Sequence, residues 1–483
     1  MRLSRRRPPG LIPLAAALAA AGLLGGVTMA SALRTGARSS SVAPASPAPG
    51  LTASRPSSVS RPTGAPTTVA PTVTLPPTTA VPPGVAPTPA NAALAAGLAQ
   101  VLANTDACLE VSDAAGHLVY SRQPDLALSP ASTQKLLVAA AALDVLGPGY
   151  RFVTSVVAAR APEGGQVGQA WLVGGGDPVL SSPEYTRFLT LQPMIAGHPV
   201  TTQVVALANQ LAAAGIRSIP GGIHGDDSRY DRTRSLPGWN PTYVQEGDVA
   251  PLGALEVDDG LDRWHPAVET ADPAAHAAGV LARLAGDAGI ATAQAADGDA
   301  PSGAVVLAAV QSPPLADIVT AMLRQSDNTT AEMLTRELDR VEGGRGTTPG
   351  GVQVVMREAA KLGLSTAGLT LVDGSGLSPQ NRASCATLLG AAGLASQPRF
   401  VPLGLLSVAG RFGTLYNRFL GTPMVGRLAA KTGNIAGVMS LVGHMDVGPP
   451  LNFAFLLNGP ISYLEGVGYE DRVVAAIGAY RGP

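Results

Sequence analysis

A serine and a lysine three residues apart, Ser132 and Lys135, could carry out chemistry together. On a helix, this spacing places both side chains on one face, one turn apart. A serine hydroxyl is a poor nucleophile until a base takes its proton, and a partly desolvated lysine can do so. The pair therefore predicts a nucleophile and its base. The S-x-x-K spacing alone is common, and exposed Ser/Lys pairs usually have no catalytic role.

A second candidate group is the triplet Ser326-Asp327-Asn328, which lies between two segments with helical patterns. Ser326 could relay a proton, and the Asn328 amide could hydrogen-bond Lys135 or a substrate amide. The triplet is a weak signal by itself.

A third group, Lys431-Thr432-Gly433, ends a predicted strand. The ammonium and hydroxyl groups could bind a carboxylate, and the glycine would let a substrate backbone approach closely. Only three of the 33 basic residues are lysines, namely Lys135, Lys361 and Lys431. A buried lysine can lose its proton and act as a base, whereas arginine stays protonated. Two of the three lysines therefore stand where that property matters, and we expect Lys361 to lie on the surface.

The elements that position these groups can be predicted in outline. Ser129 is a natural N-cap and Pro130 suits the first helical position, so we expect Ser132 in the first turn of a buried, Ala/Leu-rich helix that stops at residues 147–149. The GGGDP stretch at residues 174–178 lacks a following GK[ST] and favours a tight turn over a phosphate cradle.

The patterns predict a mixed α+β and α/β chain with several domains. We expect an antiparallel sheet flanked by helices, split by a mainly β insertion. The predicted boundaries are 92–150 for the first part of the main domain, 151–303 for the insertion and 304–483 for the second part.

The N-terminal region predicts export. Residues 1–33 combine four arginines with a long apolar run, which indicates either a cleaved signal peptide or a membrane anchor. Residues 34–91 are rich in Pro, Ser and Thr and are typical of a disordered linker. The body would then lie at the outer face of the cell membrane, in the periplasm or in the cell wall. In such an oxidising compartment, Cys108 and Cys385 could form one disulfide.

In the order S-x-x-K, S-D-N, K-T-G, the motifs resemble the signature of penicillin-recognising serine acyltransferases. The stretches SPASTQKLL, VGGGDP, SPPLADIVTAMLRQSDNTTAEML, LVDGSGLSPQNR and KTGNIAGVMSLVG are similar to the D-alanyl-D-alanine carboxypeptidase/endopeptidase family called penicillin-binding protein 4, peptidase family S13. The resemblance covers roughly residues 91–483. It implies a penicillin-binding, transpeptidase-like fold interrupted by a large insertion between the first two motifs.

The resemblance also implies roles for the motif residues. Ser132 would form the acyl-enzyme with Lys135 as its base, while Ser326, Asn328 and Lys431 would assist proton transfer and binding. The expected substrates are peptidoglycan stem peptides, with β-lactams as covalent inhibitors.

Substrate binding would fall to the end of the last motif. Lys431 and Thr432 would hold the terminal carboxylate, with Gly433 and Asn434 beside the substrate. The backbone N–H groups of Ser132 and Asn434 would form the oxyanion hole.

Two other functions share these features. A serine β-lactamase uses the same motifs, but the long insertion and the lack of an evident extra carboxylate base argue against it. A non-catalytic peptidoglycan-binding protein would have had no reason to keep all three motifs complete.

Several classes of function are disfavoured. The net charge is −1 and the charges are interspersed, which argues against nucleic acid as a partner. The six histidines show no H-E-x-x-H pattern, so we expect no metal site and no cofactor. The DGSGLS stretch at residues 373–378 has two glycines in a short polar segment, which favours a structural turn.

Overall fold

A computed structural model describes residues 88–264 and 267–482. The predicted signal or anchor at residues 1–33, and nearly all of the predicted linker, lie outside this part of the chain. Across the described ranges, we find no helix with the length and apolar character needed to span a bilayer.

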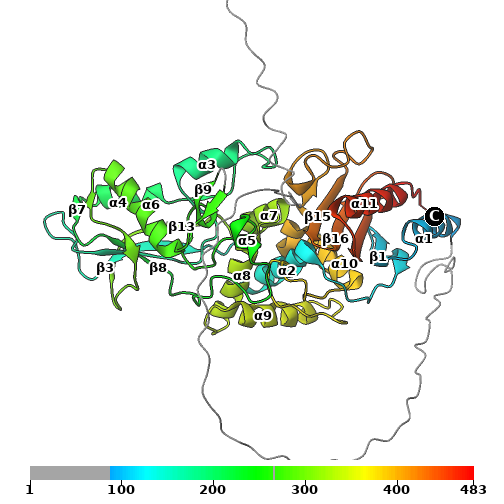
Figure 1. Ribbon diagram of the computed structural model, residues 1–483, viewed down its shortest axis with the longest axis horizontal. Coiled ribbons are helices and arrows are strands. Elements are labelled where there is room, and N and C mark those ends of the chain that lie inside the picture. Colours follow the sequence, from blue (N-terminus) through cyan, green and yellow to red (C-terminus); the bar gives the residue numbers. More distant parts are fainter. Residues whose placement is uncertain (1–87, 265–266, 483) are drawn as a thin grey trace, which may run out of the picture. The chain divides into compact units, whose positions relative to one another are not determined.

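The main domain is built on a six-stranded sheet in the order β14-β15-β16-β17-β1-β2, in which every neighbouring pair is antiparallel (Figure 1). Its strands are β1 (Asp106–Asp113), β2 (Leu118–Arg122), β14 (Ser407–Val408), β15 (Leu428–Ile435), β16 (Val438–Met445) and β17 (Leu451–Asn458). The first and last long strands, β1 and β17, are direct neighbours. The sheet therefore joins chain segments from both sides of the insertion.

Alternate residues of the long strands enter two hydrophobic cores. Along β17, Ala454 and Leu456 enter one core, and Phe453, Phe455 and Leu457 enter the other. This alternation is the period-2 geometry of a strand buried on both faces. Five helices contribute to the first core: α2 (Lys135–Val145), α7 (Leu315–Gln325), α8 (Asn328–Val341), α9 (Thr348–Lys361) and α10 (Cys385–Gly393). The second core is covered by α1 (Pro89–Val101) and α11 (Tyr463–Gly478). The predicted antiparallel sheet flanked by helices is thus confirmed.

The inserted segment forms a second sheet of five strands in the order β12-β8-β4-β3-β13. These strands are β3 (Val153–Ala158), β4 (Ala170–Val173), β8 (Ile223–Asp226), β12 (Ala296–Asp297) and β13 (Val305–Gln311). Strand β13 starts beyond residue 303 and pairs with β3, so this sheet continues past the expected boundary. Helices α4 (Val205–Ala213) and α6 (Pro273–Asp287) supply much of its core.

Smaller elements complete the described chain: α3 (Pro183–Thr190), α5 (Thr242–Gln245), β5 (Leu180–Ser181), β6 (Thr202–Gln203), β7 (Ser218–Ile219), β9 (Leu261–Trp264), β10 (Ala267–Glu269) and β11 (Ala291–Thr292). Short 3₁₀ turns are η1 (Ala131–Gln134), η2 (Asp258–Gly260), η3 (Leu394–Ser396), η4 (Pro398–Gly404) and η5 (Gly413–Leu415).

The predicted disulfide between Cys108 and Cys385 is confirmed, with an S–S distance of 2.05 Å. It links β1 to the first residue of α10 across 277 positions of sequence. Both residues are fully buried. The bridge therefore joins the two halves of the main domain inside its core.

The predicted N-cap at Ser129 is wrong. Its backbone N–H donates to Asn458 Oδ1 at 2.8 Å, and Asn458 Nδ2 donates to its carbonyl at 3.1 Å. Because β17 holds this backbone, the Ser129 hydroxyl is buried without a partner and caps no helix. Ser132 consequently lies in the 3₁₀ turn η1, and the α-helix begins only at Lys135.

Candidate active site

The Lys135 amine lies at the centre of the candidate site. The side chain is fully buried at the start of α2. Its Nζ lies 2.8 Å from Ser132 Oγ, 2.6 Å from Asn328 Oδ1 and 2.6 Å from the Ser375 carbonyl. The 3₁₀ turn brings the S-x-x-K pair into direct contact, as the spacing predicted. The site also includes Ser375, which the sequence had not indicated.

The turn between α7 and α8 presents the S-D-N triplet. Ser326 ends α7 in the left-handed region, with φ +61°. Asp327 caps α8 by accepting from Thr330 N at 3.1 Å, and Asn328 is the first residue of that helix. A left-handed residue followed directly by an N-cap reverses the chain sharply. The turn thereby places Ser326 and Asn328 against two different lysines.

The second lysine, Lys431, is fully buried on β15. Its Nζ lies 2.7 Å from Ser326 Oγ and 2.7 Å from the Thr432 carbonyl. Thr432 Oγ1 donates to Thr414 Oγ1 at 2.8 Å. The five residues predicted to do the chemistry are thus connected as two groups, one around each buried amine.

The backbone of β15 passes close to the nucleophile turn. A Cβ added to Gly433 would lie 3.0 Å from Ser132 N and 2.8 Å from the Pro130 carbonyl. Only glycine therefore allows this close approach. Asn434 follows on the same strand and is exposed. The backbone of β15 at Gly433 and the backbone of η1 at Ser132 therefore lie side by side.

Burial of the two amines dominates the electrostatics. It lowers the pKa of Lys135 to about 8, an effect that the carboxylates of Asp327, Asp373 and Glu332 partly oppose. Burial, followed by the charge of Lys135, lowers the pKa of Lys431 well below its ordinary value. Both lysines therefore give up a proton more readily than a surface lysine does.

The turn at residues 373–378 is held by two buried carboxylates. Asp373 accepts from the backbone N–H groups of Gly376 at 2.9 Å and Ser378 at 2.6 Å. Glu332 accepts from Gly374 N at 2.9 Å and Ser375 N at 2.7 Å. The stretch is therefore structural, and it also presents a carbonyl to Lys135. Sequence reasoning missed Glu332, although its position four residues after Asn328 places both on one helix face.

Replacing Gly376 with alanine is expected to slow acylation by a labelled penicillin about 10²-fold, because small displacements of reacting groups are costly. Gly376 has φ +86°, and an added Cβ would overlap the Ala131 carbonyl and lie 3.0 Å from Ser132 N. The nucleophile turn would have to move. Gly116→Ala is the matched control, since Gly116 has φ +89° and no heavy atom within 4 Å of an added Cβ.

Both variants carry the same penalty for a left-handed residue, about 1–2 kcal/mol. The melting temperature should fall further for Gly376→Ala, which adds the overlap with η1, and the acylation rate of the folded protein should fall only for that variant. Similar acylation rates in the two variants would show that the contact with η1 is unimportant.

Comparison with known proteins places this geometry in a family. The model of the D-Ala-D-Ala carboxypeptidase 3 (S13) family matches residues 90–265 and 263–477. A carboxypeptidase of Mycobacterium tuberculosis is 35% identical over 386 residues, covering 76% of this chain and 80% of that protein. A D-alanyl-D-alanine carboxypeptidase of an Actinomadura species is 31% identical over 458 residues, covering 77% and 81%.

Among solved structures, penicillin-binding protein 4 from Haemophilus influenzae has the same fold. Its TM-score is 0.66 at 20% sequence identity, covering 80% of this chain and 99% of that chain. The resemblance drawn from the motifs is confirmed: the chain belongs to the D-Ala-D-Ala carboxypeptidase 3 (S13) family of serine-type DD-peptidases.

Proposed function

We propose that the protein cleaves the terminal D-Ala-D-Ala bond of peptidoglycan stem peptides, or the cross-link between two stems, through an acyl-serine at Ser132. The observation that carries this proposal is the 2.8 Å contact between the buried Lys135 amine and the Ser132 hydroxyl. The amine has lost most of its preference for the charged form, so it can take a proton from the hydroxyl.

In the first half of the reaction, Lys135 accepts the hydroxyl proton as Ser132 Oγ bonds to the scissile carbonyl carbon. The bond from that carbon to the leaving nitrogen then breaks, and the nitrogen needs a proton. Ser326 can supply it and recover one from Lys431, 2.7 Å away. In the second half, water attacks the ester carbonyl carbon and passes one proton through Ser326 to Lys431. Lys135 returns its proton to Ser132 Oγ as the ester C–O bond breaks, and the shortened stem leaves as a carboxylic acid that ionises in solvent.

The developing oxyanion would be bound by the N–H groups of Ser132 and Asn434, whose backbones the close approach at Gly433 brings together. Loss of one such donor typically costs about 10²–10³-fold in rate. Strand β14 pairs with β15 only as far as Ala430. In the described part of the chain, the edge of β15 beyond that residue has no strand partner on this side, so an extended substrate could align along it.

We further propose that Lys431 and Thr432 bind the substrate's terminal carboxylate. An anion at this position would favour the ammonium form of Lys431. Since like charges repel, a charged Lys431 would favour the neutral form of Lys135.

The proposed location is outside the cytoplasm, with the N-terminal segment as a signal or an anchor. The buried disulfide supports this location, because such bonds persist in oxidising compartments. β-Lactams are proposed as covalent inhibitors of the same serine.

Incubation of the full chain with purified muropeptides tests the proposal. Mass spectrometry should detect D-alanine release from pentapeptide monomers, or conversion of cross-linked dimers to monomers, or both. Each product identifies one of the two cleavage types. Intact muropeptides together with rapid turnover of a β-lactam would favour a β-lactamase instead, and binding without any product would favour a non-catalytic role.

A further inference from the structure

The surroundings of Lys135 determine where its lone pair points once it is neutral. The neutral amine has two N–H groups and one lone pair. The Ser375 carbonyl and Asn328 Oδ1, each 2.6 Å away, can only accept hydrogen bonds. They take both N–H groups, so the lone pair is left facing Ser132 Oγ. Resting on the proposed function, this arrangement makes the amine an acceptor for the hydroxyl proton.

The orientation of the Asn328 amide is fixed by the inserted segment. Asn328 Nδ2 donates to the Asp248 carbonyl at 2.7 Å. Because that carbonyl cannot donate, the amide nitrogen must face it and the amide oxygen must face Lys135. The next residues hold the same contact, since Ala250 N donates to Thr329 Oγ1 at 3.1 Å. A flipped amide would offer its N–H groups to the lone pair and compete with Ser132.

The turn that carries the Ser375 carbonyl is held by the same segment. Trp239 Nε1 donates to Asp373 Oδ2 at 2.9 Å, and both residues are buried. Leu377 of that turn belongs to a small apolar cluster with Trp239 and Val249. The inserted segment therefore contacts both acceptors of the Lys135 amine, directly at Asn328 and through Asp373 at Ser375.

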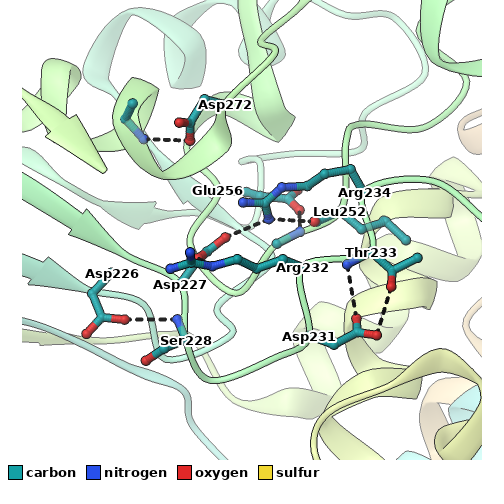
Figure 2. Close-up of polar contacts among 12 residues, drawn as sticks. Asp226, Asp227, Ser228, Asp231, Arg232, Thr233, Arg234, Leu252, Glu256 and Asp272 are labelled. Atoms are coloured by element: carbon teal, nitrogen blue, oxygen red, sulfur yellow. Dashed lines mark hydrogen bonds and ion pairs between the residues drawn. The ribbon is translucent and has the colours of Figure 1, made fainter. Parts of the chain in front are cut away.

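These contacts come from a loop whose two ends are joined. Leu252 N donates to the Arg234 carbonyl at 2.9 Å, and Arg234 Nη1 donates to the Leu252 carbonyl at 2.9 Å. The Arg234 guanidinium also lies 2.6 Å from Asp227. Figure 2 shows this ion pair as a dashed line. Asp227 directly follows β8 of the inserted sheet. The loop between residues 234 and 252 is thus anchored to that sheet while its middle contacts the main domain.

We propose that the 234–252 loop positions the two acceptors of the Lys135 amine and so directs its lone pair at Ser132. The loop residues act as positioning groups and need not touch the substrate. The charged groups around Lys135 are Asp327 and Glu332 at α8, Asp373 in the turn at residues 373–378, and Lys431 on β15. None belongs to the loop, so variants of the loop add or remove none of these charged side chains.

Trp239→Phe tests the loop's contact with Asp373, because it keeps an aromatic ring in the apolar cluster and removes the indole N–H donor together with one of the two rings. We expect the acylation rate constant with a labelled penicillin to fall about tenfold, the order expected for losing a hydrogen bond to a charged group. Trp171→Phe is the control: Trp171 lies on β4 of the same inserted segment and packs near His224. Its acylation rate should match that of wild type.

The pH dependence separates positioning from simple destabilisation. When the Ser375 carbonyl is held less firmly, it stabilises the ammonium form of Lys135 less, and the pKa of Lys135 falls. The acid limb of the plot of acylation rate against pH should therefore move about 0.5 unit to lower pH. Partial unfolding would reduce the amount of active protein without moving this limb. Thr329→Val removes the acceptor for Ala250 N and gives an independent second variant, expected to shift the limb in the same direction.

The positioning role would be overturned if Trp239→Phe and Thr329→Val had the acylation rate of wild type and the same acid limb in the pH profile. Slower acylation with an unmoved limb would overturn it as well. Neither result would affect the proposed function, because wild type would still be labelled at Ser132. Failure to label wild type at Ser132 would reject the proposed function itself.

Discussion

Ser132→Ala is expected to remove covalent labelling by penicillin and to lower muropeptide cleavage by about 10⁴-fold or more, the order of loss seen when an activated nucleophile is deleted. The reason is chemical: Ser132 Oγ is the hydroxyl in contact with the Lys135 amine, and alanine offers no oxygen to form an ester. Mass spectrometry of the intact protein after incubation with benzylpenicillin measures the outcome directly.

Ser129→Ala is the matched control for this variant. Ser129 lies three residues earlier on the same segment, and its buried hydroxyl has no hydrogen-bond partner. Removing that hydroxyl should leave labelling and cleavage at the wild-type level. Equal labelling of Ser132→Ala and wild type would falsify the assignment of the nucleophile.

The second large effect is expected from Lys135→Arg. Arginine keeps its charge, so it cannot accept the serine proton, and its larger planar head does not fit a fully buried position that already has three partners. Acylation should fall about 10³-fold, within the range attributed to a general base.

The pH profile of the wild type gives the same residue a second signature. Because the pKa of Lys135 is lowered to about 8, the neutral fraction should rise about tenfold per pH unit below pH 8 and then level off. Acylation should follow this rise.

Lys361→Arg is the control for the lysine substitution. Its amine is exposed and pairs with Asp144 and Glu358, as expected for a surface lysine, so either basic residue should serve. An acylation rate that is flat between pH 6 and 8, or a Lys135→Arg variant as active as Lys361→Arg, would contradict the role of Lys135 as base.

The sequence predicted which residues meet better than it predicted how they meet. The i, i+3 spacing and the three ordered motifs pointed to a shared site, and the structure brings those side chains within hydrogen-bond distance. The local conformation around Ser132 was predicted incorrectly, because the competing partner of Ser129 is Asn458, 329 positions away. A local capping rule has no access to such a contact.

The supporting residues were missed for the same reason. Trp239 acts on Asp373 across 134 positions, and nothing near either residue in the sequence signals the pair. Glu332 offered a partial signal, as a charged residue on a helix face that must be buried. The sheet itself was easier to predict, because strand alternation and apolar content are local properties.

The adjacency of β1 and β17 has a consequence for how the molecule comes into being. Ser132 lies near one border of the interrupted domain, whereas Lys431 and the strand that flanks β1 are synthesised some 300 residues later. A ribosome that has released only the first half of the chain has therefore made neither a closed sheet nor a complete site. Wall-cleaving activity would arise only after β15 to β17 have been made, so a chain that stops before them could not cleave the wall.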